Sequence, residues 1–263
     1  MTTTHIPVAI IGGGQAGLSV SWYLGRMGVE HIVLEAQTPV HAWADTRWDN
    51  FTLVTPNWHC RLPGYAYAGP DPDGFMTRDE VVDWLAGWLD TFEPPLRTHT
   101  RVTRLANRAE GGFELTLNGP ETLTCDQAVI ATGGYPLPVI PPRTQAHWTP
   151  VSPRSILSCT AMPPSCPTVR SWWSVPDSPR QIAEDLHLAG RQVHLAVGSA
   201  PRVARFYRGG RDCMTWLADM GLYDKPAQQY PGGKAAIEKT NHYVTGRDGG
   251  RDVDLRQFAA EGG

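Results

Sequence analysis

A glycine-rich stretch near the N-terminus, Gly12-Gly13-Gly14-Gln15-Ala16-Gly17, constrains the fold of this chain more than any other feature. The short β-branched run Val8–Ile11 precedes it, and apolar residues follow at helical spacing from Leu18 to Met27. A second apolar run, His31–Leu34, ends on the acidic residue Glu35. This order predicts a strand, a tight turn, a helix and a parallel strand, which is the first unit of a Rossmann-type α/β fold.

Each glycine has a separate physical purpose in such a turn. Gly12 allows the sharp change from strand to helix, Gly14 lets the backbone approach a pyrophosphate, and Gly17 lets the helix pack closely on the strand. The N-terminus of the helix also faces the phosphate charge. The residues that we expect to bind a dinucleotide here are Gly12, Gly14, Gln15, Ala16 and Gly17.

The end of the second strand supplies the partner for the sugar. Glu35 is placed to accept hydrogen bonds from the ribose hydroxyls, and Ala36 follows it in the same site. An acid at this position disfavours a 2′-phosphate. The expected ligand is therefore FAD or NAD rather than NADP.

Later segments favour FAD. Thr77 and Glu80 form a capping box that opens a helix. Three β-rich stretches follow at Arg97–Leu105, Gly112–Leu117 and Leu123–Ile130, and they predict a β-meander inserted into the nucleotide-binding fold. The last of them leads into the small-residue turn Ala131-Thr132-Gly133.

With these motifs the sequence resembles the class B flavoprotein monooxygenases, which include the flavin-containing monooxygenases. The resemblance extends over residues 6–142 and, less closely, 181–263. It implies that Ala131, Thr132 and Gly133 return the chain to the FAD, that Trp43 and Arg47 contact the FAD, and that the backbone of Val102 meets the adenine. For the neighbouring Trp48 and Trp58, packing within the loop is the alternative to a role in binding.

The second half resembles a module that binds NADPH. Gln181–Gly190 predicts a helix with Gly190 just past its end, and Gln192–Val197 predicts the next strand. No acid follows that strand, and Arg202 is available for a 2′-phosphate, unless it is simply a solvated surface residue. However, the chain has no second G-x-G-x-x-G motif.

The segment between the two halves is irregular. Residues 144–180 are rich in proline and serine and show no hydrophobic period. Read one base earlier, the codons of Ser171–Pro179 are compatible with a strand followed by Gly-Ser-Gly-Gln-Ser-Gly, which suggests two compensating frameshifts. A genuine insertion is the alternative. We therefore predict an FAD-binding domain over 1–142, an irregular segment over 143–180, and a remnant of an NADPH-binding domain over 181–263 whose NADPH site is damaged. The chain also lacks the return to the FAD domain that this class normally has, so it looks truncated at its C-terminus.

Composition excludes several other classes of protein. A net charge of −3 gives no field that would attract nucleic acid or an anionic membrane, and the basic stretch Arg205–Arg211 is better explained as a solvated loop or an NADPH-facing patch. No signal peptide or membrane-spanning run is evident, and the five cysteines form no C-x-x-C pair, so a cytoplasmic protein with reduced thiols is expected. The histidines show no metal-ligand spacing.

The functional prediction is an FAD-dependent oxidoreductase, with NADPH-dependent oxygenation of a small molecule as the activity that the resemblance implies. Two alternatives stay open. One is a flavin-binding remnant without catalytic activity, and the other is an NAD-dependent dehydrogenase that uses only the first site. The sequence nominates no catalytic acid or base, and it indicates neither the substrate nor the oligomeric state.

Overall fold

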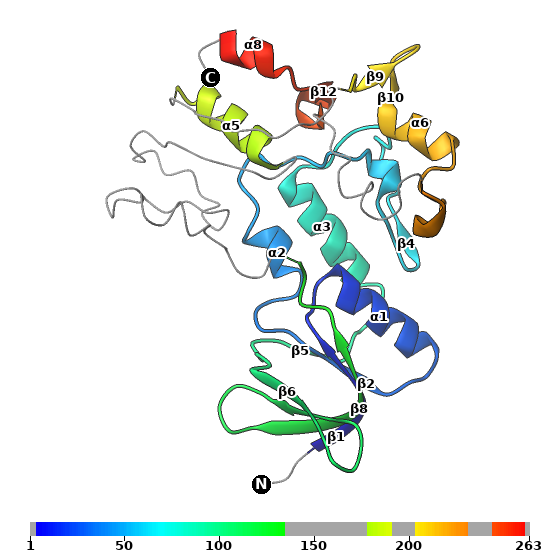
Figure 1. The fold of residues 1–263 in the computed structure, drawn as a ribbon, viewed down its shortest axis with the longest axis vertical. Helices are drawn as coiled ribbons and strands as arrows, with labels where there is room; N and C mark the ends of the chain where they lie inside the picture. The colour runs from blue at the N-terminus through cyan, green and yellow to red at the C-terminus, as the bar shows by residue number, and fades with distance from the viewer. Residues whose placement is uncertain (1–3, 135–177, 191–202, 231–243, 261–263) are drawn as a thin grey trace.

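The computed structural model describes residues 4–134, 178–190, 203–230 and 244–260. A six-stranded mixed sheet, in the order β5-β2-β1-β8-β7-β6, forms one end of the molecule (Figure 1). Its strands are β1 (Thr4–Ile11), β2 (His31–Leu34), β5 (Leu96–Arg97), β6 (Arg104–Asn107), β7 (Phe113–Thr116) and β8 (Thr122–Ile130). The first four strands in this order are parallel, and β8, β7 and β6 form an antiparallel meander. The predicted α/β class with a Rossmann-type sheet is confirmed.

The predicted strand β1 is buried on both of its faces, because successive side chains point to opposite sides of a sheet. Val8 and Ile10 pack against Val20 and Leu24 of helix α1 (Gln15–Arg26). On the other face, Ala9 packs against the meander. Burial on both sides explains why the run Val8–Ile11 is continuously apolar.

The remaining helices of the N-terminal half lie over the carboxyl end of the sheet. Helix α3 (Arg78–Leu89) packs Val81, Leu85 and Trp88 into a core shared with α1 and α2 (His41–Ala44). The predicted capping box is confirmed: the Thr77 hydroxyl accepts a hydrogen bond from the Glu80 N–H, and the Glu80 carboxylate accepts one from the Thr77 N–H.

One predicted strand is wrong. Arg97–Leu105 is divided into β5, which pairs with β2 at one edge of the sheet, and β6, which pairs with β7 at the opposite edge. Between them the chain crosses over through residues 98–103, and His99 there adopts a positive φ of 50°. Val102 lies in this crossover and packs into the core although it is not in a strand.

The described residues after 178 form small elements at the far end of the molecule from the sheet (Figure 1). The helices there are α5 (Ser178–Leu188), α6 (Cys213–Asp219) and α8 (Leu255–Ala260). Two short hairpins accompany them, β9 (Phe206–Tyr207) with β10 (Arg211–Asp212) and β11 (Val244–Thr245) with β12 (Arg251–Asp252). The short elements that complete the description are β3 (Arg61–Leu62), β4 (Tyr65–Ala66), and the 3₁₀ turns η1 (Asn57–His59), η2 (Ala227–Gln229) and η3 (Arg247–Gly249).

Helix α5 connects these late elements to the N-terminal half. The Gln181 side chain donates to the Thr52 carbonyl at 3.3 Å and accepts from the Thr52 N–H at 3.4 Å, so it bonds both backbone groups of that residue. On the same helix, Asp185 pairs with Arg247, and Glu184 pairs with Arg251. The predicted helix and its terminal glycine are confirmed, since Gly190 follows α5 with a φ of 73°.

Candidate functional site

The glycine turn lies at the carboxyl end of β1, as the sequence predicts. Gly12 has a φ of 113°, a conformation that L side chains rarely adopt, and a Cβ there would collide with the carbonyl oxygen of Ala131. A Cβ at Gly17 would collide with the Gly12 carbonyl oxygen and crowd Ile10. These two glycines are therefore required by the packing of the protein on itself.

Gly14 is different. It caps the N-terminus of α1 in an extended conformation, with φ −86° and ψ −175°, and no side chain caps that helix end. A Cβ on Gly14 would meet nothing within 4 Å among the described residues. The packing of the protein does not require a glycine here. A phosphate that approaches the N–H groups of this helix end does require one, because a side chain would occupy its space.

Glu35 reaches back to this turn. Its carboxylate accepts a 2.6 Å hydrogen bond from the Gly13 N–H and a 2.8 Å bond from the Gln37 N–H. The acid thereby fixes the shape of the glycine turn, which sequence reasoning did not foresee. Each oxygen keeps a further lone pair that can accept a hydrogen bond from a ribose hydroxyl. The contact between Glu35 and the ribose stays a prediction. Ala36 follows Glu35 and is half-buried.

The turn Ala131-Thr132-Gly133 lies beside the glycine turn. The Ala131 N–H donates to the Ile11 carbonyl at 2.9 Å, and Gly133 has a φ of 78°. Thr132 and Gly133 are exposed. The structure therefore places this turn against the glycine turn, and its contact with FAD stays a prediction.

Trp43 and Arg47 form the side of the site that follows β2. The Trp43 Nε1–H donates to Gln15 Oε1 at 3.3 Å, which joins α2 to the start of α1. The Arg47 guanidinium lies 4.7 Å from the centre of the Trp43 ring and 5.7 Å from that of Phe51. Such cation–π contacts hold the guanidinium in place without using its N–H donors.

Arg47 has unused hydrogen-bonding capacity. Its Nε is buried and has no hydrogen-bond partner within the described part of the chain. Burial lowers the pKa of the Arg47 guanidinium, yet from so high a value that the group stays charged at neutral pH. A buried, charged donor without a partner is costly unless a ligand supplies an acceptor. These residues therefore fit an anionic cofactor such as a dinucleotide.

Two other tryptophans of this loop, Trp48 and Trp58, pack against aromatic neighbours, but their buried Nε1 atoms have no hydrogen-bond partner among the described residues, so packing and a role in binding both stay open. Trp48 is buried and its ring lies 5.0 Å from that of Phe51, in an edge-to-face arrangement. Trp58 lies against His59, with ring centres 5.3 Å apart.

Val102 lies in the crossover between β5 and β6, where its side chain packs on the core of the sheet. The crossover is joined to the end of β2, because the Thr100 N–H donates to the Glu35 carbonyl at 2.7 Å. Val102 is thus close in the chain to the residues beside the expected ribose position. The contact between its backbone and an adenine stays a prediction.

Several predicted features lie outside the described residues. They are Arg202, the strand Gln192–Val197, and nearly all of the irregular segment 143–180, of which only the beginning of α5 is described. The frameshift and the damage to the NADPH site stay hypotheses.

The stretch Arg205–Arg211 is predicted to be a solvated loop or an NADPH-facing patch, and solvation is wrong for Arg205. Its side chain is fully buried, its Nε donates to Asp212 at 2.5 Å, and the guanidinium lies 4.1 Å from the centre of the Phe75 ring. The Nη1 and Nη2 atoms have no hydrogen-bond partner among the residues described. Burial lowers the pKa of Arg205, while the charge of Asp212 opposes that effect. No local pattern could reveal this arrangement, because Phe75 is distant in sequence.

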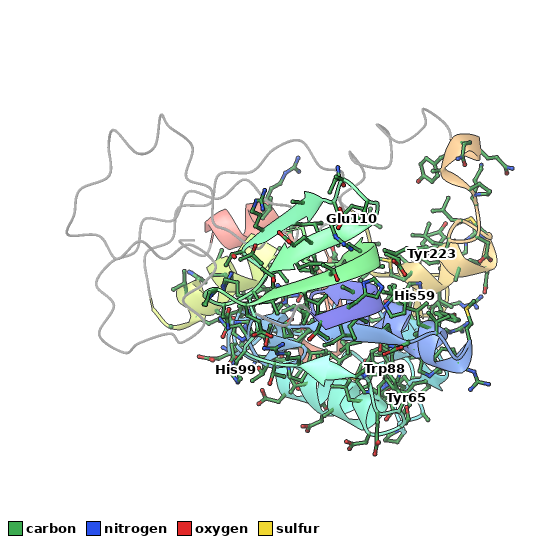
Figure 2. All side chains as sticks on the ribbon, turned by 90° about the horizontal axis from the view of Figure 1, so that it is seen from below. His59, Tyr65, Trp88, His99, Glu110 and Tyr223 are labelled. Atoms are coloured by element: carbon green, nitrogen blue, oxygen red, sulfur yellow. The ribbon has the colours of Figure 1, made fainter. Side chains whose placement is uncertain are left out.

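A second contact joins the same two regions. The rings of His59 and Tyr223 lie side by side, with centres 4.8 Å apart (Figure 2). Burial, and secondly the charge of Arg61, lower the pKa of His59. Within the described ranges, no group of histidine, cysteine and acidic residues could hold a metal ion, and no helix is long and apolar enough to cross a membrane.

The pyridine nucleotide-disulphide oxidoreductase family matches residues 9–153 of the chain. An oxidoreductase designated CzcO-like, from Geobacillus kaustophilus, is 30% identical over 219 residues, which are 82% of this chain and 61% of the relative. A Baeyer-Villiger monooxygenase from Streptomyces coelicolor is 32% identical over 149 residues, which are 52% of this chain and 27% of the relative. The chain therefore spans less than two thirds of either relative.

Among solved structures, a flavin-containing monooxygenase from Stenotrophomonas maltophilia superposes with a TM-score of 0.65 at 21% identity. The match covers 82% of this chain and 64% of that protein. A bacillithiol disulfide reductase from Staphylococcus aureus gives a TM-score of 0.60 at 14% identity, over 92% of this chain and 68% of that protein. Both show the same fold. The resemblance to class B flavoprotein monooxygenases is confirmed.

Proposed function

The chain belongs to the pyridine nucleotide-disulphide oxidoreductase family, and from this premise we propose that it binds FAD at the glycine turn and acts as an FAD-dependent oxidoreductase of the monooxygenase type. The observation that supports this proposal most directly is the contrast between the three glycines. Gly12 and Gly17 are required by internal packing, whereas Gly14 borders open space at an uncapped helix N-terminus. Such an arrangement is suited to a pyrophosphate.

The residues of the site have distinct positions toward such a ligand. The N–H groups at the start of α1 would hold the pyrophosphate, Glu35 the ribose, and the backbone at Val102 the adenine. Trp43 and Arg47 would complete the site from the α2 side, with the orphaned Arg47 Nε as donor. FAD, when bound, supplies the two-electron chemistry of the reaction. The chain contributes binding, orientation and the exclusion of water.

Replacement of Arg47 tests this assignment. In Arg47→Met the side chain keeps its length but loses its charge and its donors, so FAD should bind about tenfold to a hundredfold more weakly, as expected for the loss of about 1.5–3 kcal/mol in hydrogen bonds to a charged group. The measurement is a titration of the apo-protein with FAD, followed by quenching of flavin fluorescence.

Arg26→Met provides a matched control. Arg26 also lies over a tryptophan, 4.9 Å from the Trp22 ring centre, but it is exposed in the last turn of α1, away from the glycine turn. The Arg26→Met variant should bind FAD as the wild type does. Equal FAD affinities for Arg47→Met and the wild type would remove Arg47 from the site.

We further propose that NADPH is the reductant in the intact family activity and that a small molecule is the substrate. The single G-x-G-x-x-G of this chain already belongs to the proposed FAD site. We therefore expect little NADPH oxidation by the FAD-loaded chain, measured by the loss of NADPH absorbance under air. Rapid, FAD-dependent NADPH oxidation would show that other residues serve the nicotinamide nucleotide.

The same preparation distinguishes the two alternatives. Flavin binding without NADPH oxidation supports a flavin-binding remnant, for which the absence of a second glycine motif is the favouring observation. A protein that does not bind flavin but binds NADH supports an NAD-dependent dehydrogenase.

A further inference from the structure

The turn between β7 and β8 contacts the crossover that links β5 to β6. The Asn118 side chain makes two hydrogen bonds to this crossover: its Nδ2 donates to the His99 carbonyl at 2.5 Å, and its Oδ1 accepts from the Arg101 N–H at 2.8 Å. At the other end of the turn, Glu121 accepts two hydrogen bonds from the Arg97 guanidinium, at 2.6 and 2.7 Å. A turn of the inserted meander therefore holds residues 97–101 at both ends.

The crossover needs this support because its backbone is strained. His99 has a φ of 50°, which is unfavourable for a residue with a Cβ. Its N–H donates to the Gln37 carbonyl at 3.1 Å, and its carbonyl is the group that Asn118 holds. The peptide groups on both sides of the strained residue are thus fixed from outside the crossover.

The two contacts of the turn differ in expected strength. Arg97 and Glu121 are both about half exposed, at 43% and 49%, and exposed ion pairs contribute little. Asn118 is exposed too, but it bonds two backbone groups that follow the strained residue directly, the His99 carbonyl and the Arg101 N–H. We therefore expect Asn118 to determine the conformation of this crossover.

The crossover lies beside the expected position of the adenosine. Thr100 donates its N–H to the carbonyl of Glu35, whose side chain faces the glycine turn, and Val102 follows two residues later. Figure 2 shows His99 on the opposite side of the view from the His59–Tyr223 contact. A change in the 99–101 backbone would displace both Val102 and the peptide that contacts Glu35.

We propose that Asn118 is a positioning residue for the adenosine half of the dinucleotide. It fixes the strained crossover so that the ribose-facing acid and the adenine-facing backbone are in place before the ligand binds, and such preorganisation raises affinity. This inference rests on the proposed function, because it assumes that the dinucleotide occupies the glycine turn.

Asn118→Ala tests the proposal in the full-length apo-protein with three probes: FAD, ADP and FMN. The variant should bind FAD and ADP about tenfold more weakly, the effect of losing two hydrogen bonds of ordinary strength. Binding of FMN, which has no adenosine, should not change. Asn107→Ala is the control, because Asn107 is also exposed on the meander but lies at the end of β6, away from the crossover.

A second substitution separates positioning from a general effect on stability. Glycine adopts a positive φ at little cost, so His99→Gly in the Asn118→Ala background should restore most of the affinity for FAD and ADP. Unchanged affinity in Asn118→Ala, an equal loss of FMN binding, or no recovery with His99→Gly would each overturn the inference. If the wild type itself binds neither FAD nor ADP, the proposed function fails. If the wild type binds both and Asn118→Ala binds them equally well, only the inference about Asn118 fails.

Discussion

Gly14→Val is expected to weaken FAD binding by up to about a hundredfold while leaving the apo-protein folded. The backbone of Gly14 is in the extended region that valine also adopts, and the added side chain would meet no described residue within 4 Å. The loss of glycine at the helix N-cap should cost at most about 1 kcal/mol. Toward a pyrophosphate, however, the side chain occupies the space that the ligand needs, and an overpacking cost of about 1–3 kcal/mol weakens binding up to about a hundredfold.

Gly17→Ala is the counterpart in the same turn. Its Cβ would collide with the Gly12 carbonyl oxygen, so this variant should lose stability even without a ligand. Thermal unfolding of both apo-variants, together with FAD titrations, measures the difference. FAD affinity that is unaffected by Gly14→Val would show that the ligand does not lie at this turn, and strong destabilisation of apo Gly14→Val would show that the adjoining space is filled.

Asp212→Ala is expected to lower the free energy of unfolding by about 3–5 kcal/mol, the usual effect of leaving a buried charge without its partner. Asp212 is the only described acid that pairs with the buried Arg205. Its other oxygen accepts from the Met214 N–H at 2.7 Å and caps α6. Urea denaturation followed by circular dichroism measures the change.

Two further variants separate the contributions at this position. Asp212→Asn keeps an acceptor for the helix cap but removes the charge, and the double variant Arg205→Met with Asp212→Asn should recover much of the loss, because no buried charge remains. Asp219→Ala breaks the exposed pair with Arg211, whose side chains are 49% and 45% exposed, and should change stability by less than about 1 kcal/mol. If Asp212→Ala were no more damaging than Asp219→Ala, Arg205 would not depend on this partner.

The parts of the site that sequence reasoning located are those encoded by neighbouring residues. The glycine turn, the acid after β2 and the capping box of α3 each depend on spacings of a few residues, and the structure places all three as expected. The Ala131-Thr132-Gly133 turn, which the family resemblance singled out, lies beside the glycine turn.

What the sequence did not reveal depends on pairing between distant segments. Local composition cannot show that residues 97 and 104 lie at opposite edges of one sheet, because the strand with which each residue pairs is distant in sequence. The burial of Arg205 depends on Phe75, and the role of Asn118 depends on the path of the crossover. These contacts arise only after the chain is folded, so no window of sequence contains them.

The pair of hydrogen bonds between Gln181 and Thr52 has a consequence for the order in which the chain acquires its structure. The two residues are 129 positions apart, so their contact closes a very long loop. During synthesis on the ribosome, all six strands of the sheet have been synthesised at Ile130, about 50 residues before Gln181. All the residues of the sheet, including the distant strands β1 and β8, are therefore available for pairing before Gln181 is synthesised. The segment around Thr52 then acquires its final partner only after α5 has left the ribosome, which makes this contact a late step in biogenesis.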